Sequence, residues 1–184
     1  MKLKVVQIGD PVLETVAKEV KDFKDPEIQK LIDNLLDTCN SEIERTAGLS
    51  APQVGKSLRI SICRRFDIDE DSKEWEVMIN PEITSKSGEK SIVWEGCLSI
   101  GVGDNALYGP VARSKRIKVK YFDRDGKPKQ LPALDYFSHV VQHEIDHLNG
   151  ILFLKYIKNP DKNLWTSKEL DKYIDRHGQF PDIE

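Results

Sequence analysis

The sequence predicts a single α+β domain over residues 1–184, and three observations lead to this fold class. Short segments with alternating apolar and polar residues, typical of half-buried strands, recur through the middle of the chain. Two longer segments repeat apolar residues every three or four positions, as amphipathic helices do. Turn signals between strands favour antiparallel pairing over a parallel, doubly wound sheet. The length is about that of one domain, and 39% apolar residues suffice for its core.

The first long helix is expected to begin at Pro26 and to end near Arg45. Asp25 provides a cap residue directly before the proline, which is a helix-start signal that Asp10-Pro11 shares. The apolar residues on one face of the helix are Ile28, Leu31, Ile32, Leu35, Leu36, Cys39 and Ile43. Since this face should be buried, Cys39 is expected to be a small core residue.

Strands are expected where the apolar period falls to two. The segments with this period are Leu58–Ile62, Trp75–Ile79, Ile83, Ile92–Trp94 and Ile117–Tyr121. After the last of them, Asp123–Gly126 has the composition of a hairpin turn and leads to a further strand around Gln130 and Leu131.

The second long helix is expected to have Asp135 as its cap and Gly150 just past its end. Its apolar members are Phe137, Val140, Val141, Ile145 and Leu148. Near the C-terminus, Thr166 and Glu169 have the spacing of a capping box and predict a peripheral helix with a structural role.

Composition excludes several classes of function. With 28 basic and 31 acidic residues and no block of five like charges, we expect no direct nucleic-acid specificity. No apolar run approaches the roughly 18 residues of a membrane span, and no glycine-rich phosphate loop follows a strand. Three cysteines far apart suit a reducing compartment, so we expect a cytoplasmic protein. An organelle stays open if a transit peptide precedes this sequence.

The second long helix carries the strongest chemical signal, His143-Glu144-Ile145-Asp146-His147. Two histidines four residues apart lie on one helix face, where both can bind one divalent metal. Glu144 follows the first histidine directly and so lies beside such a metal, as a general base would. A third protein ligand must come from elsewhere, with one position left open for water.

Four residues bear on the third ligand. His139 is eight residues from His147, a rise of about 12 Å, which is too far for the same ion. The third histidine of a metzincin is replaced here by Phe153, which cannot bind metal. Glu169 keeps a gluzincin-like metallopeptidase open as an alternative. Cys97 is the better candidate, because it follows a strand in a glycine-containing loop and completes a known catalytic set. A Cys97–His nucleophile pair and a noncatalytic metal-binding module also stay open.

Three motifs in order carry a resemblance to a known family. They are Gly48-Leu49-Ser50-Ala51-Pro52-Gln53, Glu95-Gly96-Cys97-Leu98-Ser99 and the helix motif His143–His147. Together with Gly9-Asp10-Pro11-Val12-Leu13, they resemble peptide deformylases over nearly the whole chain. The resemblance implies antiparallel sheets packed around a central helix that carries the HEIDH motif.

The resemblance also implies a reaction, removal of the formyl group from the N-terminal formyl-methionine of new polypeptides. It implies that Cys97, His143 and His147 bind one divalent metal, Fe²⁺ in the cell, with Zn²⁺, Ni²⁺ or Co²⁺ as alternatives in purified protein. Glu144 would move the proton of the attacking water. The side chain of Gln53 and the backbone N–H of Leu98 would stabilise the oxyanion.

Substrate contacts follow from the same alignment. Gly48 and Gly96 are expected where the substrate backbone passes closely, and the methionine side-chain pocket is expected to include Tyr136, His139 and Val140. Glu95 would orient the loop around Cys97, paired with Arg113 or Arg116. The resemblance implies an N-formylmethionyl peptide as the partner, and a contact with the ribosome at the nascent-chain exit stays open.

The chain also departs from the family pattern. Thr46 stands where a glycine is usual, and Ser50 stands where alanine is common. The proline that usually follows the second motif is absent, and Ile100 leads into a longer run, Gly101–Asn105. Substrate contacts from that loop are therefore not transferred from the family.

Overall fold

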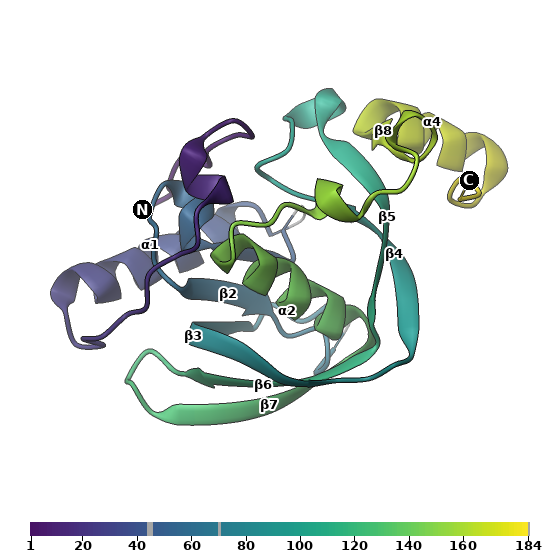
Figure 1. Cartoon of the computed structure of the whole chain (residues 1–184). Coiled ribbons are helices and arrows are strands. Elements are labelled where there is room, and N and C mark those ends of the chain that lie inside the picture. Colours follow the sequence, from purple (N-terminus) through teal and green to yellow (C-terminus); the bar gives the residue numbers. More distant parts are fainter. Residues whose placement is uncertain (44–45, 70, 184) are drawn as a thin grey trace.

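The structure, a computed structural model, describes residues 1–43, 46–69 and 71–183. Two antiparallel sheets flank a central helix, so the predicted α+β fold class is confirmed (Figure 1). The five-stranded sheet has the order β1-β2-β3-β6-β7 and the three-stranded sheet the order β4-β5-β8. The strands are β1 Gly48–Ser50, β2 Ile60–Arg64, β3 Trp75–Lys86, β4 Lys90–Gly96, β5 Leu107–Ser114, β6 Arg116–Phe122, β7 Pro128–Leu134 and β8 Trp165–Thr166.

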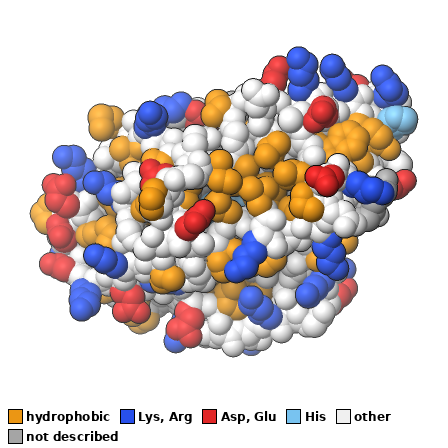
Figure 2. Space-filling model, turned by 45° about the horizontal axis from the view of Figure 1, so that its top comes forward, with side chains coloured by type: hydrophobic (Ala, Val, Ile, Leu, Met, Phe, Trp, Pro, Cys, Tyr) orange, Lys and Arg blue, Asp and Glu red, His pale blue; other side chains and the backbone are white. Residues whose placement is uncertain are grey.

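The α-helices are α1 Pro26–Ser41, α2 Asp135–Leu148, α3 Pro160–Asn163 and α4 Ser167–His177. Short 3₁₀ helices are η1 Pro11–Glu14, η2 Ala51–Val54, η3 Gly103–Asn105 and η4 Phe153–Tyr156. Among the described residues, no helix combines the length and the apolar character needed to cross a membrane. On the face shown in Figure 2, basic and acidic side chains are intermixed around apolar groups.

The first long helix forms as predicted but is shorter. Asp25 caps α1 by accepting a hydrogen bond from the Glu27 N–H at 2.8 Å. The helix ends at Ser41 with Glu42 as its C-cap, and the predicted end, Arg45, lies outside the described residues. Its apolar face packs on β1 and β2, and Cys39 is fully buried there.

The central helix follows β7 without a loop, and here the predicted cap is wrong. The N-cap residue is Leu134, and Asp135 is itself the first residue of α2, with φ of +46°. Strand β7 runs directly into the helix, and the Asp135 N–H is bonded to the Lys115 carbonyl at 2.8 Å, which leaves Asp135 no capping position. Gly150 follows the helix end with φ of +70°, as predicted.

Strands β6 and β7 confirm the predicted hairpin, with Phe122 opposite Pro128. The segments Trp75–Ile79 and Ile83, predicted separately, belong to the single strand β3, with register shifts between Ile79 and Glu82 and between Ile83 and Ser85. The strand β5 was not predicted; it pairs with all seven residues of β4.

Candidate metal and catalytic site

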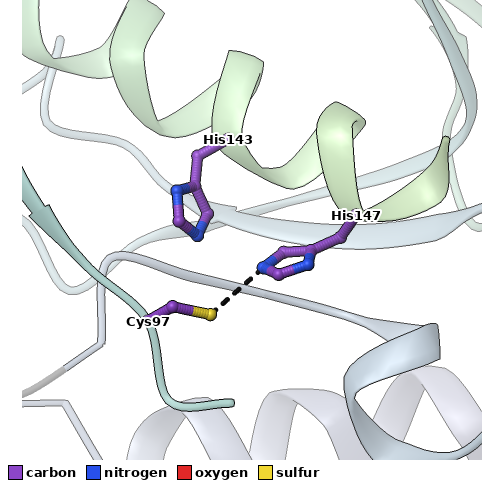
Figure 3. A group of neighbouring side chains, drawn as sticks. All are labelled: Cys97, His143 and His147. Carbon is purple, nitrogen blue, oxygen red and sulfur yellow. Dashed lines mark hydrogen bonds between the residues drawn. The ribbon is translucent and has the colours of Figure 1, made fainter. Parts of the chain in front are cut away.

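The first part of the site is a row of histidines on α2. The helix packs its apolar face on β2, β3 and β6, where Val141 and Ile145 are buried. Residues 143 and 147 are one turn apart on another side of this helix. Figure 3 shows both rings extending from α2 toward the same point. The fixed core face therefore determines the direction of both histidines.

Cys97 reaches that point from the end of β4. Its Sγ atom lies 3.3 Å from His147 Nε2 (Figure 3). One ligand atom from each of Cys97, His143 and His147 lies within 4.8 Å of the others, close enough for all three to bind one ion. The structure therefore brings the three predicted ligands together from two elements far apart in sequence.

The carboxylate of Glu95 fixes the orientation of His143. Its Oε2 lies 2.9 Å from His143 Nδ1, and Arg113 donates to Oε1 and Oε2 at 2.5 and 3.0 Å. Arg113 also donates to Asp146 at 2.7 Å, so the pairing of Arg113 with Glu95 joins β5 to both β4 and α2. Burial opposes ionisation of Glu95, but the nearby His139 ring and the hydrogen bonds from His143 and Arg113 hold its pKa well below the usual range.

These contacts fit a metal site. With Nδ1 of His143 donating its proton to Glu95, the lone pair of Nε2 is free on the side of Cys97. Two imidazole nitrogens and one thiolate are donors that suit Zn²⁺ and Fe²⁺, and three protein ligands leave a fourth position open.

Glu144 is buried beside this group of residues. Ser50 donates a hydrogen bond to its Oε2. Burial raises the pKa of Glu144 to about 7, and the charge of His143 and the Ser50 hydrogen bond act in the opposite direction. A Cβ atom on Gly48 would lie 2.6 Å from Glu144 Oε1, so the glycine leaves room for this carboxylate.

Gln53 has a fixed amide orientation. Its Oε1 accepts the backbone N–H of Ser50 at 2.8 Å, which leaves the NH₂ group to face Cys97 Sγ and Ser99 Oγ, each at 3.4 Å. Leu98 follows Cys97 and lines the same cavity as Gln53. The Gln53 amide therefore directs an N–H donor toward the metal-competent group, which consists of Cys97, His143 and His147.

A cavity of about 360 Å³ opens in front of these residues. Its wall includes Tyr136, His139 and Val140, all predicted for the methionine pocket, and the site residues Gln53, Cys97, His143 and Glu144. Tyr136 is 46% exposed, whereas His139 and Val140 are buried.

Gly48 and Gly96 also line the cavity. A Cβ atom on Gly96 would meet the Tyr108 ring at 2.5 Å, so this glycine makes room for the ring. Passage of a substrate backbone along both glycines stays a prediction.

Two contacts at the site were missed in the sequence. In the sequence, Ser50 is only a departure from the usual alanine, because its bond to Glu144 needs the contact between β1 and α2 that the fold supplies. Tyr108 lies on β5, which the sequence did not predict as a strand. The only feature of the sequence that marks this residue is its aromatic side chain.

Glu169 lies outside the metal-competent group. Its carboxylate accepts hydrogen bonds from the Thr166 N–H at 3.0 Å and the Thr166 hydroxyl at 2.7 Å, which forms the predicted capping box of α4. Those hydrogen bonds lower its pKa. Among the described residues, the group able to hold a metal consists of Cys97, His143 and His147. Glu169 therefore has a structural role that accounts for its position.

Comparison with known proteins identifies a family that the chain matches. Residues 2–163 match the family described as polypeptide deformylase. The peptide deformylase of Carboxydothermus hydrogenoformans is 42% identical over 156 residues, which cover 85% of this chain and 93% of the relative. That of Desulfotalea psychrophila is 39% identical, with 95% and 98% of the two chains covered.

Solved structures agree with the sequence relatives. A peptide deformylase from Legionella pneumophila superposes with a TM-score of 0.76 at 33% identity, covering 98% of this chain and all of that one. A class I type b peptide deformylase from Acinetobacter baumannii, described as Met-Ala-Ser bound, gives 0.75 at 33% identity, with 85% and 99% covered. The chain therefore belongs to the peptide deformylase family and is an enzyme of that type.

Proposed function

We propose that this enzyme removes the formyl group from the N-terminal formyl-methionine of newly made polypeptides and releases formate. The observation that carries the proposal is convergence on one cavity: the Glu144 carboxylate, the Gln53 amide and the Cys97–His143–His147 group all line or adjoin it. Water adds to the formyl carbon, the C–N bond breaks, and the products are formate and a free amine.

In this proposal Cys97, His143 and His147 hold one divalent ion, which is Fe²⁺ in the cell and can be replaced by Zn²⁺, Ni²⁺ or Co²⁺. A bound ion of this kind lowers the pKa of a coordinated water toward about 7 and polarises a carbonyl oxygen. Thiolate ligation predicts that iron-loaded enzyme loses activity in air, while nickel- or cobalt-loaded enzyme keeps it. Full air stability of protein with iron shown to be bound would contradict the iron assignment.

Glu144 moves the proton. Its carboxylate accepts a proton from the attacking water and returns it to the departing amine, a cycle that needs a pKa near the working pH. The pKa of about 7 that burial gives Glu144 meets this condition. The charge that develops on the formyl oxygen would be stabilised by the Gln53 amide and the Leu98 backbone N–H. The fixed orientation of the Gln53 amide supports that role.

The substrate is proposed to lie extended between the two sheets. Strand β1 is an edge strand of the five-stranded sheet and β4 is an edge strand of the three-stranded sheet. Gly48 on β1 and Gly96 on β4 line the cavity between them, so an extended peptide can pass beside both backbones. Tyr136, His139 and Val140 would enclose the methionine side chain. The Met-Ala-Ser complex of the Acinetobacter baumannii relative supports a peptide of this kind as ligand.

We further propose that residues 1–184 act as one catalytic domain in the cytoplasm, where the enzyme meets nascent chains at the ribosome. The alternative metallopeptidase is not favoured, because the Glu169 carboxylate serves as part of the α4 capping box.

The decisive experiment compares three peptides with metal-loaded enzyme prepared without oxygen. Formyl-Met-Ala-Ser should yield one formate for each free amine formed. Acetyl-Met-Ala-Ser is the matched control for the amide, and unblocked Met-Ala-Ser reports peptidase activity. Cleavage between Met and Ala without release of formate would overturn the proposal in favour of the peptidase.

A further inference from the structure

His139 is the histidine of α2 that cannot bind the proposed metal together with His147. It lies one helical turn before His143 on the same face and is only 2% exposed. An imidazole at such a position requires hydrogen-bond partners, since a buried polar group without a partner is destabilising. The contacts of His139 therefore indicate what the residue does.

Both ring nitrogens of His139 face β4. Nε2 lies 2.8 Å from Ser91 Oγ, and Nδ1 lies 3.5 Å from Glu95 Oε1. Ser91 and Glu95 are four residues apart on β4, so they project from the same side of the strand. His139 and His143 are four residues apart on α2. The pair Ser91 and Glu95 on β4 thus faces the pair His139 and His143 on α2, and both pairs have the same four-residue spacing.

The contacts limit where the ring protons of His139 lie. Glu95 is an acceptor, so Nδ1 of His139 carries the ring proton and points it at Oε1. With one proton on the ring, Nε2 accepts the hydroxyl proton of Ser91. At 3.5 Å the contact with Glu95 is long for a hydrogen bond, and Nδ1 has no closer partner among the described residues. Glu95 Oε2, in turn, faces Nδ1 of His143.

We propose that His139 is a positioning residue of the metal site, which acts through Glu95 to hold the ring of His143 in its ligating orientation. The inference rests on the proposed function, because it needs a metal at Cys97, His143 and His147. It assigns to His139 a role beyond the wall of the methionine pocket. Mutation of a residue that orients a metal ligand through hydrogen bonds typically lowers metal affinity by 10–100-fold.

The test uses Co²⁺ as the probe, because its visible absorption reports ligand geometry. His139→Leu removes both polar contacts, whereas His139→Asn keeps an N–H donor at the position of Nδ1. Val140→Ala is the matched control for packing, since Val140 is a neighbouring buried residue of the same cavity wall. Co²⁺ affinity and absorption are measured for each folded variant, together with KM and kcat for formyl-Met-Ala-Ser.

We expect His139→Leu to lower Co²⁺ affinity about 10-fold and to alter the absorption bands. His139→Asn should restore most of the affinity, and Val140→Ala should bind Co²⁺ as the wild type does.

Wild-type affinity and absorption in His139→Leu, with only KM changed, would overturn the proposal and leave His139 as pocket wall. If His139→Leu does not fold, Ser91→Ala decides, because an unchanged spectrum in that variant overturns the proposal. Failure of the wild type to bind Co²⁺ contradicts the proposed function itself, and this inference with it.

Discussion

Glu144 acquires its chemical properties from a few immediate neighbours. Burial raises the pKa of its carboxyl to about 7, while the hydrogen bond from Ser50 acts against that rise. Gly48 leaves space for the carboxylate, because a Cβ atom there would lie 2.8 Å from Glu144 Cδ. The carboxylate is therefore held in one place, and its two protonation states are close in free energy near neutral pH.

Glu144→Gln isolates the proton-transfer step, because it preserves size and removes the proton acceptor. The variant should bind metal as the wild type does, since the proposed ligands are Cys97, His143 and His147. Turnover should fall 100- to 10,000-fold, or roughly 3–5 kcal/mol of transition-state stabilisation. Metal content and formate release measure the two effects separately. A turnover within about threefold of the wild type, with metal bound, would show that Glu144 is not the general base.

Ser50→Ala tests how Glu144 is tuned. The Ser50 hydrogen bond lowers the pKa of Glu144, so its removal should raise that pKa. Because the general base must be ionised, the acidic limb of the pH–rate profile should then move to higher pH, by about one unit for a hydrogen bond to a charged group. Ser61→Ala is a suitable control, since Ser61 is a buried serine opposite Ser50 in the β1–β2 pair. An acidic limb at the wild-type pH would show that Ser50 does not influence Glu144.

At the scale of single residues, spacing made the proposed ligands accessible to prediction. Two histidines one helical turn apart need only a helix to share a face, and the sequence of α2 shows that helix clearly. Cys97 was favoured by its place in a glycine-containing loop after a strand, and the family resemblance implied the same ligand. Its proximity to His147 depends on where β4 lies relative to α2, which only the fold shows. Ser50 and its contact with Glu144 depend on a similar long-range placement, which periodicity does not contain.

Secondary-structure elements separate the two readings of the third ligand. Cys97 lies at the end of β4 and faces α2, whereas Glu169 lies in the first turn of α4 and caps that helix. Thr166, the N-cap of α4, donates two hydrogen bonds to this carboxylate. Of the two candidate ligands, therefore, Cys97 faces the histidines of α2, and Glu169 stabilises the start of α4.

Cys97→Ala should lose most of the bound metal, because it removes one of the three proposed protein ligands. Glu169→Gln should keep both metal and turnover, since glutamine also completes a capping box. Metal content after gel filtration and formate release from formyl-Met-Ala-Ser check both variants. Metal loss in Glu169→Gln and retention in Cys97→Ala would favour the peptidase reading instead.

The strand β5 shows why one element was not predicted. Gly109 and Pro110 disfavour a strand, and the segment follows a glycine-containing run. Long-range pairing overrides that local preference, because Trp94 and Val93 of β4 pair with Pro110 and Val111. Antiparallel pairing along the whole of β4 holds Arg113 beside Glu95.

At the scale of the whole molecule, the sequence was sufficient for the fold class and for both long helices. The family resemblance implied antiparallel sheets around that helix, but periodicity did not show which strands form each sheet (Figure 1), because the division depends on pairings between distant segments. The proposed metal site lies where those parts meet: β4 belongs to the three-stranded sheet, and α2 packs on the five-stranded sheet. A metal bound by Cys97, His143 and His147 would therefore link the two halves of the fold.

This arrangement predicts that metal binding stabilises the entire chain. A ligand that binds only the folded state at 1,000 times its Kd adds about 4 kcal/mol to the free energy of unfolding. For a chain of this size, that corresponds to a rise in Tm of roughly 8–16 °C. Thermal unfolding of wild-type protein with and without Co²⁺ measures the difference.

Cys97→Ala provides the control, because without the third ligand the same Co²⁺ concentration should give a much smaller rise in Tm. Glu144→Gln should keep the full rise despite its loss of turnover, since its ligands are intact. Equal Tm values for metal-free and metal-loaded wild type, with binding established separately, would contradict a structural link through the metal. By linkage, the unfolded chain would then bind the ion as tightly as the folded protein does, and the site would not depend on the fold that brings Cys97 to α2.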